Sequence, residues 1–361
     1  MVEFATIMKS AQVQIPASTR SNTSESGVVS VYPLQAGSSV SSLLDLCKAS
    51  ADQLRLDILR VLSRDSFGVL ELCRIFDCKQ SSISHHLKVL SNGGLVLKRR
   101  EGNSIFYHRA LSHIGESNEL AEFSTLKKEL YQTIDSQSVS NSVKKRLTDI
   151  QQERAESSAS FFRDNADKFQ EQQEQVAAYE LYGPNIRDFI SSSLGESLKK
   201  NGTVLEIGPG EGEFLTELSR LFNQVIALDN SGKMLKKAQQ LTSAKKLTNI
   251  GFIKGDTRAT GIDSYPIDCV VMNMVLHHIP SPADVFYDIA KALDVGGQLF
   301  ITELCSHDQP WVKDSCGDLW LGFDPKGLGD WAQGAGFREG ESIYLAQRNG
   351  FRVQFRQFIK K

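Results

Sequence analysis

The chain has 361 residues, 40% of them hydrophobic and 23% charged, and its formal net charge is −2. This length is sufficient for two domains, and the composition is ordinary for a soluble protein. No apolar run approaches the roughly 20 residues of a membrane-spanning helix, and the first residues lack the apolar core of a signal peptide. We therefore expect a cytoplasmic protein with no membrane partner, whose six scattered cysteines are reduced.

Residues 1–38 are rich in Ser, Thr, Gln and Gly and show no sustained hydrophobic period, which predicts a disordered tail. The next segment has helical periodicity followed by two short strand patterns. The predicted elements are helices at 51–62, 69–76 and 81–90 and strands at 95–100 and 104–109. Three helices followed by a hairpin predict a winged helix-turn-helix domain over residues 39–112.

Basic residues are concentrated in the second half of this domain. Six basic residues and one acid, Glu101, lie between Lys79 and Arg109, although the whole chain is slightly acidic. Such a local basic stripe is typical of a nucleic-acid surface. A solvated basic face without a partner would show the same charge pattern, but the helix-turn-helix context favours DNA.

Several segments within residues 41–112 resemble the ArsR/SmtB winged-helix repressors. They are Ala51-Asp-Gln-Leu-Arg-Leu-Asp-Ile-Leu-Arg60, Ser81-Ser-Ile-Ser-His-His-Leu-Lys-Val-Leu90, Gly94-Leu-Val96 and Arg99-Arg-Glu-Gly-Asn-Ser-Ile-Phe-Tyr107. The resemblance implies a homodimer whose two recognition helices enter successive major grooves of double-stranded DNA. Two-fold symmetry then predicts a palindromic operator.

The matching positions identify nine residues that are expected to face the DNA. They are Lys79, Gln80, Ser81, Ser82, Ser84, His85, Lys88, Arg99 and Arg100. Ser84 and His85 are the candidates for contacts to base edges. The candidates for phosphate contacts, which position a protein without specifying the sequence, are Lys79, Ser82, Arg99 and Arg100.

Many proteins of this type sense metals or arsenite through cysteines on the helix before the turn. Glu71-Leu-Cys73 resembles the beginning of such a metal box, but Cys78 follows five residues later and not two. If the helix continued, five residues would rotate the second thiol by about 140°. A metal- or arsenite-responsive regulator stays an alternative, and two buried small apolar side chains are the simpler interpretation.

Residues 113–179 are polar, glutamine-rich and helical in pattern, which predicts a linker that contains possible dimer helices. One apolar stripe consists of Leu120, Phe123, Leu126, Leu130 and Ile134. The stripe fits either a dimer interface or ordinary packing against the same chain. A single amphipathic helix is expected over 151–182, and it leads into a second domain over residues 180–361.

The second domain begins with a buried strand pattern at 204–207 that runs into a glycine-rich loop and then a helix. Its glycines are Gly208, Gly210 and Gly212, and a strand, glycine turn and helix open a doubly wound nucleotide-binding sheet. The loop lacks the Gly-Lys-Ser/Thr of a phosphate loop, and it is acidic at Glu206, Glu211 and Glu213. An acidic loop suits a positively charged ligand such as S-adenosylmethionine.

The following strand patterns end in acids or an amide, at Asp229, Asp256 and Asn273, and Arg348-Asn-Gly350 predicts a terminal hairpin. A dehydrogenase is disfavoured by this combination. Residues 180–361 resemble the small-molecule branch of class I S-adenosylmethionine-dependent methyltransferases, which implies an α/β, Rossmann-like sheet with an antiparallel last strand. The cofactor-binding residues implied are Glu206, Gly208, Gly210, Gly212, Asp229, Asp256 and Asn273.

Candidates for catalysis and acceptor binding follow the fourth and fifth predicted strands. His277 and His278 follow the fourth strand, and either could act as a general base. The acceptor-site candidates after the fifth strand are Glu303, His307, Trp311 and Trp320. The spacing of Cys305, His307, Asp308 and Cys316 fits no standard zinc site, so no metal is expected.

These patterns lead to two classes of function. The first is an ArsR-like transcriptional regulator, expected to be a repressor, whose methyltransferase domain binds S-adenosylmethionine or S-adenosylhomocysteine and senses or methylates a small molecule. The second is an active small-molecule methyltransferase whose DNA-binding half regulates its own operon.

Overall fold

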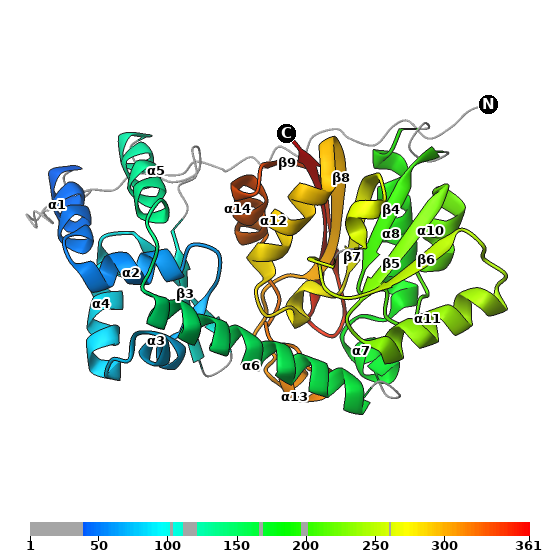
Figure 1. Cartoon of the computed structure of the whole chain (residues 1–361), viewed down its shortest axis with the longest axis horizontal. Coiled ribbons are helices and arrows are strands. Elements are labelled where there is room, and N and C mark those ends of the chain that lie inside the picture. The colour runs from blue at the N-terminus through cyan, green and yellow to red at the C-terminus, as the bar shows by residue number, and fades with distance from the viewer. Residues whose placement is uncertain (1–38, 102–103, 111–120, 166–168, 196–200, 260) are drawn as a thin grey trace, which may run out of the picture. The chain divides into compact units, whose positions relative to one another are not determined.

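The computed structural model describes residues 39–101, 104–110, 121–165, 169–195, 201–259 and 261–361. The predicted tail over 1–38 and the apolar residue Leu120 lie outside these ranges. Residues 40–361 form one unit (Figure 1). In the ranges that the structure describes, no helix is long and apolar enough to cross a membrane.

The N-terminal part of this unit is helical and ends in a hairpin. Its elements are α1 (Ser39–Ser50), α2 (Gln53–Val61), β1 (Phe67–Gly68), α3 (Val69–Phe76), α4 (Gln80–Asn92), β2 (Val96–Glu101) and β3 (Ser104–Arg109). The strands form an antiparallel sheet in the order β1-β3-β2. The hairpin β2–β3 is called the wing below. The predicted helix-turn-helix and hairpin are confirmed.

Local chemistry explains the helix boundaries here. Asp52 precedes α2 in an extended conformation, and its carboxylate accepts a hydrogen bond from the backbone N–H of Arg55, as a helix N-cap does. At the C-terminal end of α3, Asp77 adopts a left-handed conformation with φ of 54° and ends the helix. The core beneath these helices is built from the fully buried side chains of Ile58, Leu72 and Leu87.

In the described part of the chain between the wing and the large sheet, the structure has four helices. They are α5 (Ala121–Asp135), α6 (Asn141–Asn165), α7 (Phe169–Ala177) and α8 (Tyr179–Ser193). The expected single helix over 151–182 is therefore wrong, because Ala178 is extended between α7 and α8. Amphipathic periodicity does not reveal such breaks, since each piece keeps its own apolar face.

The C-terminal part is a seven-stranded, mostly parallel sheet in the order β6-β5-β4-β7-β8-β10-β9 (Figure 1). Its strands are β4 (Thr203–Ile207), β5 (Gln224–Asp229), β6 (Ile250–Lys254), β7 (Ile267–Asn273), β8 (Leu293–Leu304), β9 (Phe337–Ala346) and β10 (Arg352–Lys360). Among the described strands of this sheet, β10 alone runs opposite to the others, because it pairs antiparallel with both β8 and β9. This is the Rossmann-like arrangement with a terminal antiparallel hairpin that the sequence predicts.

Alternating side chains give the sheet two buried faces, because neighbouring residues of a strand point to opposite sides. On β4, Val204 joins the core formed with α8 and the helix α10 (Leu215–Leu221), whereas Leu205 joins the core of the other face. That second core includes the helices α12 (Pro282–Ala292) and α14 (Pro325–Gly334). A sheet covered on both faces leaves the carboxyl ends of its parallel strands as the place for a ligand.

Candidate functional site

A cavity of about 510 Å³ lies at the carboxyl ends of β4, β5, β6 and β7. Six of the seven residues predicted to bind the cofactor line it: Glu206, Gly208, Gly210, Asp229, Asp256 and Asn273. The strand order reverses between β4 and β7, since β5 and β6 lie on one side and β8 on the other. Ligands of open α/β sheets bind at such a switch point.

The three glycines of the loop serve different purposes, although all have positive φ. A Cβ on Gly208 would approach Val275 Cγ2 to within 2.3 Å, so this position requires glycine for packing. A Cβ on Gly210 would meet no described atom within 4 Å, which leaves the backbone open toward the cavity. Gly212 does not line the cavity, but it lets the loop approach Ala238 on the helix α11 (Gly232–Ala244).

Glu206 places a buried carboxyl group on the cavity wall. It is 1% exposed, Asn273 Nδ2 donates to its Oε1 at 3.4 Å, and its Oε2 has no hydrogen-bond partner among the described residues. Burial raises the pKa of Glu206 to about 8, and the bond from Asn273 opposes this only in part. A buried carboxyl with a free oxygen fits the ammonium group of S-adenosylmethionine.

Two further carboxylates end the neighbouring strands. Asp229 ends β5, where its Oδ1 accepts a hydrogen bond from Ser231 N at 2.7 Å and burial raises its pKa to about 6. Asp256 follows β6; burial raises its pKa, but hydrogen bonds from the backbone and the guanidinium of Arg258 hold it below the usual value. The acceptor oxygens of these acids fit the hydroxyl and amino groups of an adenosine.

The cavity extends beyond the predicted cofactor residues. Its wall includes His278, Gln151 and Phe162 of α6, and Tyr179 and Tyr182 of α8. No sequence pattern indicated that α6 and α8 contribute to this wall. These helices lie outside the strand–turn–acid motifs and carry no local signal for a cavity, so only the folded chain shows their contribution.

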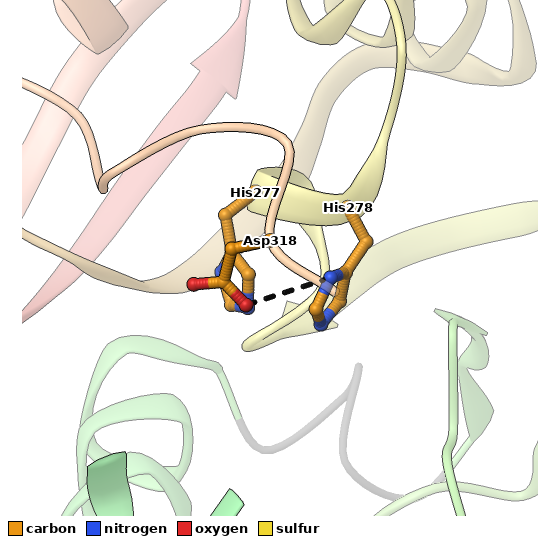
Figure 2. Close-up of side chains that lie close together, drawn as sticks. All are labelled: His277, His278 and Asp318. Carbon is orange, nitrogen blue, oxygen red and sulfur yellow. Dashed lines mark ion pairs between the residues drawn. The ribbon is translucent and has the colours of Figure 1, made fainter. Parts of the chain in front are cut away.

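His277 and His278 occupy the short 3-10 helix η2 (Leu276–His278), which follows β7 (Figure 2). His277 does not line the cavity that the described residues enclose. Its Nδ1 lies 2.6 Å from Glu303 Oε1, and the charges of Glu303 and Asp318 overcome the effect of burial and raise its pKa to about 9. For His278, burial and the charge of His277 lower the pKa well below its usual value.

The four acceptor-site candidates lie outside the cavity as the described residues form it. Glu303 is fully buried against His277, and His307 packs its ring edge-on against Phe351. Trp311 also packs against Phe351. Trp320 is 1% exposed, and its indole N–H donates to the carbonyl of Ile279. These positions differ from the expectation that the four side chains line an acceptor site.

The helix α4 presents the predicted DNA-reading residues on one face. Its inner face is formed by the buried side chains of Ile83, Leu87 and Leu90. The side chains exposed on the opposite face are Gln80, Ser81, Ser84, His85 and Lys88, and Lys79 is exposed at the N-cap. The predicted residue Ser82 is half-buried. The helix contains no acid, so its outer face is compatible with a phosphate backbone.

The wing places its two predicted arginines differently. Arg100 is exposed, whereas the Arg99 side chain is 16% exposed and forms a 2.7 Å ion pair with Glu101. The Arg99 guanidinium lies 5.5 Å from the ring of Trp320 and 5.6 Å from the ring of Phe323. Arg99 is thus held within the chain, and this differs from the expectation that it contacts phosphate.

The two cysteines of the partial metal box do not lie on one uninterrupted helix. Because α3 ends at Phe76, the backbone N–H of Cys78 donates back to the carbonyl of Cys73. Burial raises the pKa of the Cys73 thiol, and the nearby charge of Cys78 raises it further. All six cysteines are free. The rotation of about 140° assumed a continuous helix, and the structure removes that assumption.

One arginine of α6 connects the helix-turn-helix to the cavity wall. Arg154 donates to both carboxylate oxygens of Glu71, at 3.0 and 2.7 Å, and to the carbonyl of Pro280, at 3.2 Å. It also forms a 3.3 Å ion pair with Asp65, which accepts a hydrogen bond from Ser281. Pro280 and Ser281 both line the cavity. Burial raises the pKa of Asp65 to about 6 against the opposing charge of Arg154.

Comparisons with known families identify two segments of the chain. Residues 52–98 match the family model of bacterial regulatory proteins of the arsR family, and residues 205–301 match that of the methyltransferase domain. The chain therefore combines an ArsR-type helix-turn-helix with a methyltransferase domain, which confirms the two resemblances seen in the sequence.

The curated relatives match only part of the chain. Phosphoethanolamine N-methyltransferase 3 of Arabidopsis thaliana is 33% identical over 111 residues, which are 29% of this chain and 22% of that protein. Protein-L-isoaspartate O-methyltransferase of Ruegeria is 28% identical over 118 residues, 33% of this chain and 51% of that protein. The match thus spans between about a fifth and a half of these relatives.

Among solved structures, magnesium protoporphyrin IX methyltransferase of Synechocystis, with bound SAH, is similar with a TM-score of 0.45. It is 15% identical, and the match covers 56% of this chain and 97% of that one.

Proposed function

We propose that this chain is a DNA-binding transcriptional repressor of the cytoplasm whose methyltransferase domain binds S-adenosylmethionine or S-adenosylhomocysteine as an effector. The observation that carries the proposal is the position of α6. Gln151 and Phe162 of this helix line the cavity, while Arg154 of the same helix is paired with Glu71 and Asp65 of the helix-turn-helix. A ligand that favours one position of α6 therefore biases the DNA-binding elements.

The operator is proposed to be palindromic double-stranded DNA bound by a homodimer. Apolar side chains that are exposed on α1 and α5 support the dimer, namely Leu43, Leu44 and Leu126, with exposed fractions of 41%, 52% and 41%. Leu43 and Leu44 are adjacent on α1, and contiguous exposed apolar side chains mark interaction surfaces. The division into domains at 39–112, 113–179 and 180–361 stays a prediction.

A second function, methylation of a small molecule, is favoured by the extent of the cavity. Beyond the carboxylates assigned to the cofactor, the wall continues through Phe162, Tyr179 and His278. When bound, S-adenosylmethionine would supply an electrophilic methyl group. The low pKa of His278 keeps its imidazole neutral. A neutral imidazole can take a proton from the small molecule that receives the methyl group.

The test is a calorimetric titration of the full-length protein with S-adenosylmethionine and S-adenosylhomocysteine, with and without DNA from its own promoter region. We expect each ligand to bind, and we expect DNA to change at least one affinity by roughly 5- to 150-fold, the usual range of allosteric coupling. The mass of the protein–DNA complex should correspond to two chains. Affinities that are indifferent to DNA would contradict the effector role and favour the enzyme.

Cofactor affinity is expected to depend on pH through Glu206. Its pKa of about 8 means that it is protonated below that pH and must lose the proton to pair with an ammonium group. Affinity should therefore be highest at or above pH 8 and fall by up to about tenfold per unit as pH decreases toward 6. Calorimetry across this range should show a flatter profile for Glu206→Gln. An equally steep profile in that variant would assign the titration to another group.

A further inference from the structure

Three side chains that can bind a metal gather beside the cavity, and the proposed function does not use them together. His277 and His278 come from η2, and Asp318 follows the short helix α13 (Trp311–Cys316) (Figure 2). His277 Nε2 and His278 Nδ1 each lie 3.8 Å from Asp318 Oδ1. One donor atom from each residue lies within 4.8 Å of the other two, and all three side chains are buried.

The carboxylate of Asp318 points to a missing partner. The residue is 4% exposed, and neither of its oxygens has a hydrogen-bond partner among the residues that the structure describes. A buried carboxylate without hydrogen bonds is costly, and such groups are normally paired or coordinate a metal. The two imidazole nitrogens, at 3.8 Å, are too distant for hydrogen bonds, and both are nearest to the same oxygen, Asp318 Oδ1.

A second carboxylate orients one of the imidazoles. Glu303 is fully buried, and its Oε1 lies 2.6 Å from His277 Nδ1, while its Oε2 accepts the backbone N–H of His277 at 3.2 Å. With Nδ1 engaged by Glu303, Nε2 is the nitrogen left toward Asp318. A carboxylate that accepts from the far nitrogen of a metal-binding histidine is the usual outer-shell arrangement, and it fixes the ring and its tautomer.

We propose that His277 Nε2, His278 Nδ1 and Asp318 bind a divalent transition-metal ion, for which zinc is the best match. Two imidazole nitrogens and one carboxylate form a donor set typical of zinc sites with an open position. Bonds of about 2.0–2.2 Å in a tetrahedron separate donor atoms by about 3.3–3.6 Å. The two observed distances of 3.8 Å require shifts of a few tenths of an ångström, and the two histidine nitrogens, which lie within 4.8 Å of each other, require a larger one if they are further apart than 3.8 Å. His278 Nδ1 also lies 3.2 Å from the carbonyl of Gly317, so coordination through Nδ1 requires this hydrogen bond to break and the ring to lose its Nδ1 proton. The negative charges of the Asp318 and Glu303 carboxylates would offset the positive charge of the divalent ion.

The ion would lie at the boundary of the cavity. His278 lines the cavity, and Phe162 of α6 contacts its ring edge-on with centroids 4.8 Å apart. Three protein ligands leave a fourth position for water or a ligand. The peptide after Asp318 is also tied to η2, because the backbone N–H groups of Leu319 and Trp320 lie 2.9 and 3.2 Å from the carbonyl of His277. Metal binding would therefore fix both segments together, whether or not the chain binds DNA.

The experiment is a titration of chelator-treated, full-length protein with cobalt(II), followed by absorption spectroscopy and by competition with zinc. We expect one equivalent of cobalt to give a spectrum of nitrogen and oxygen ligands that zinc abolishes. Asp318→Asn should weaken binding by at least about 100-fold, and Glu303→Gln by about 10- to 100-fold. His307→Gln is the matched control, because His307 is a half-buried histidine outside the cluster, and it should bind as the unmodified chain does.

Other results would overturn the proposal. If no tight binding occurs, the cluster is an imidazolium held between two carboxylates. A thiolate-to-cobalt charge-transfer band would place the metal on cysteines, with Cys73 and Cys78 as the first candidates. Unchanged affinity in Asp318→Asn would also exclude this site. If Asp318→Asn fails to fold, the ligand signature in the spectrum of the unmodified chain still decides between nitrogen–oxygen and thiolate ligands.

Discussion

Replacing Asp229 with Ala is expected to weaken the binding of S-adenosylmethionine severely. Asp229 ends β5 at the cavity, where Ser231 N engages only its Oδ1. We propose that the carboxylate accepts both ribose hydroxyls, and hydrogen bonds to a charged group contribute about 1.5–3 kcal/mol each. Loss of two such bonds corresponds to a roughly 100- to 10,000-fold higher Kd, which calorimetry at pH 8 would measure.

The control for this prediction is Asp294→Ala. Asp294 is an exposed aspartate of the same sheet, and it does not line the cavity that the described residues form. Its substitution removes the same charge from the same domain and should leave the Kd within about twofold, because surface changes away from a site have small effects. If Asp229→Ala retains affinity while its far-ultraviolet spectrum is unchanged, the ribose assignment is wrong.

Ser84→Glu is expected to reduce affinity for promoter DNA by at least about 100-fold, because bringing like charges together at an interface costs several kcal/mol. Ser84 is exposed on the outer face of α4, between Ser81 and Lys88, opposite the buried Leu87. A carboxylate there would face the phosphates of a bound duplex. Fluorescence anisotropy with labelled promoter DNA at two salt concentrations would measure the loss.

Ser157→Glu is the matched control for this substitution. Ser157 is an exposed serine of α6, so it has the same residue type and helical setting, and it does not line the cavity formed by the described residues. It should keep DNA affinity within a few-fold, the small difference coming from the change in net charge. Equal losses in the two variants would mean that α4 does not enter the groove.

The residues that line the cavity at the strand ends were predictable because strand, turn and acid are local features of the sequence. Each predicted residue is at or near the end of a strand, and parallel strands bring their carboxyl ends to one edge of a sheet. Asp229, Asp256 and Asn273 therefore converge on the cavity although up to 44 residues separate them. The pattern alone also indicates the outer face of α4, since Ile83, Leu87 and Leu90 recur at helical spacing.

The cluster of His277, His278 and Asp318 could not be predicted from local sequence patterns. His277 and His278 were singled out for catalysis. The sequence does not reveal that Asp318, 40 residues after His278, lies beside both of them with neither oxygen hydrogen-bonded among the described residues. Arg99 was grouped with Arg100 because charge patterns do not distinguish neighbours on a strand. Their side chains point to opposite faces, and only the folded chain places Arg99 against Trp320.

The sequence by itself determined the two domain types, the order of the strands along the chain, and the residues at the mouth of the sheet, because periodicity and glycine turns act over a few residues. Two features were decided by the tertiary structure alone. The helix α6 forms part of the cavity wall, and its Arg154 contacts Glu71 and Asp65. Contacts between residues 83 or more positions apart depend on how whole elements pack, and no local pattern encodes that packing.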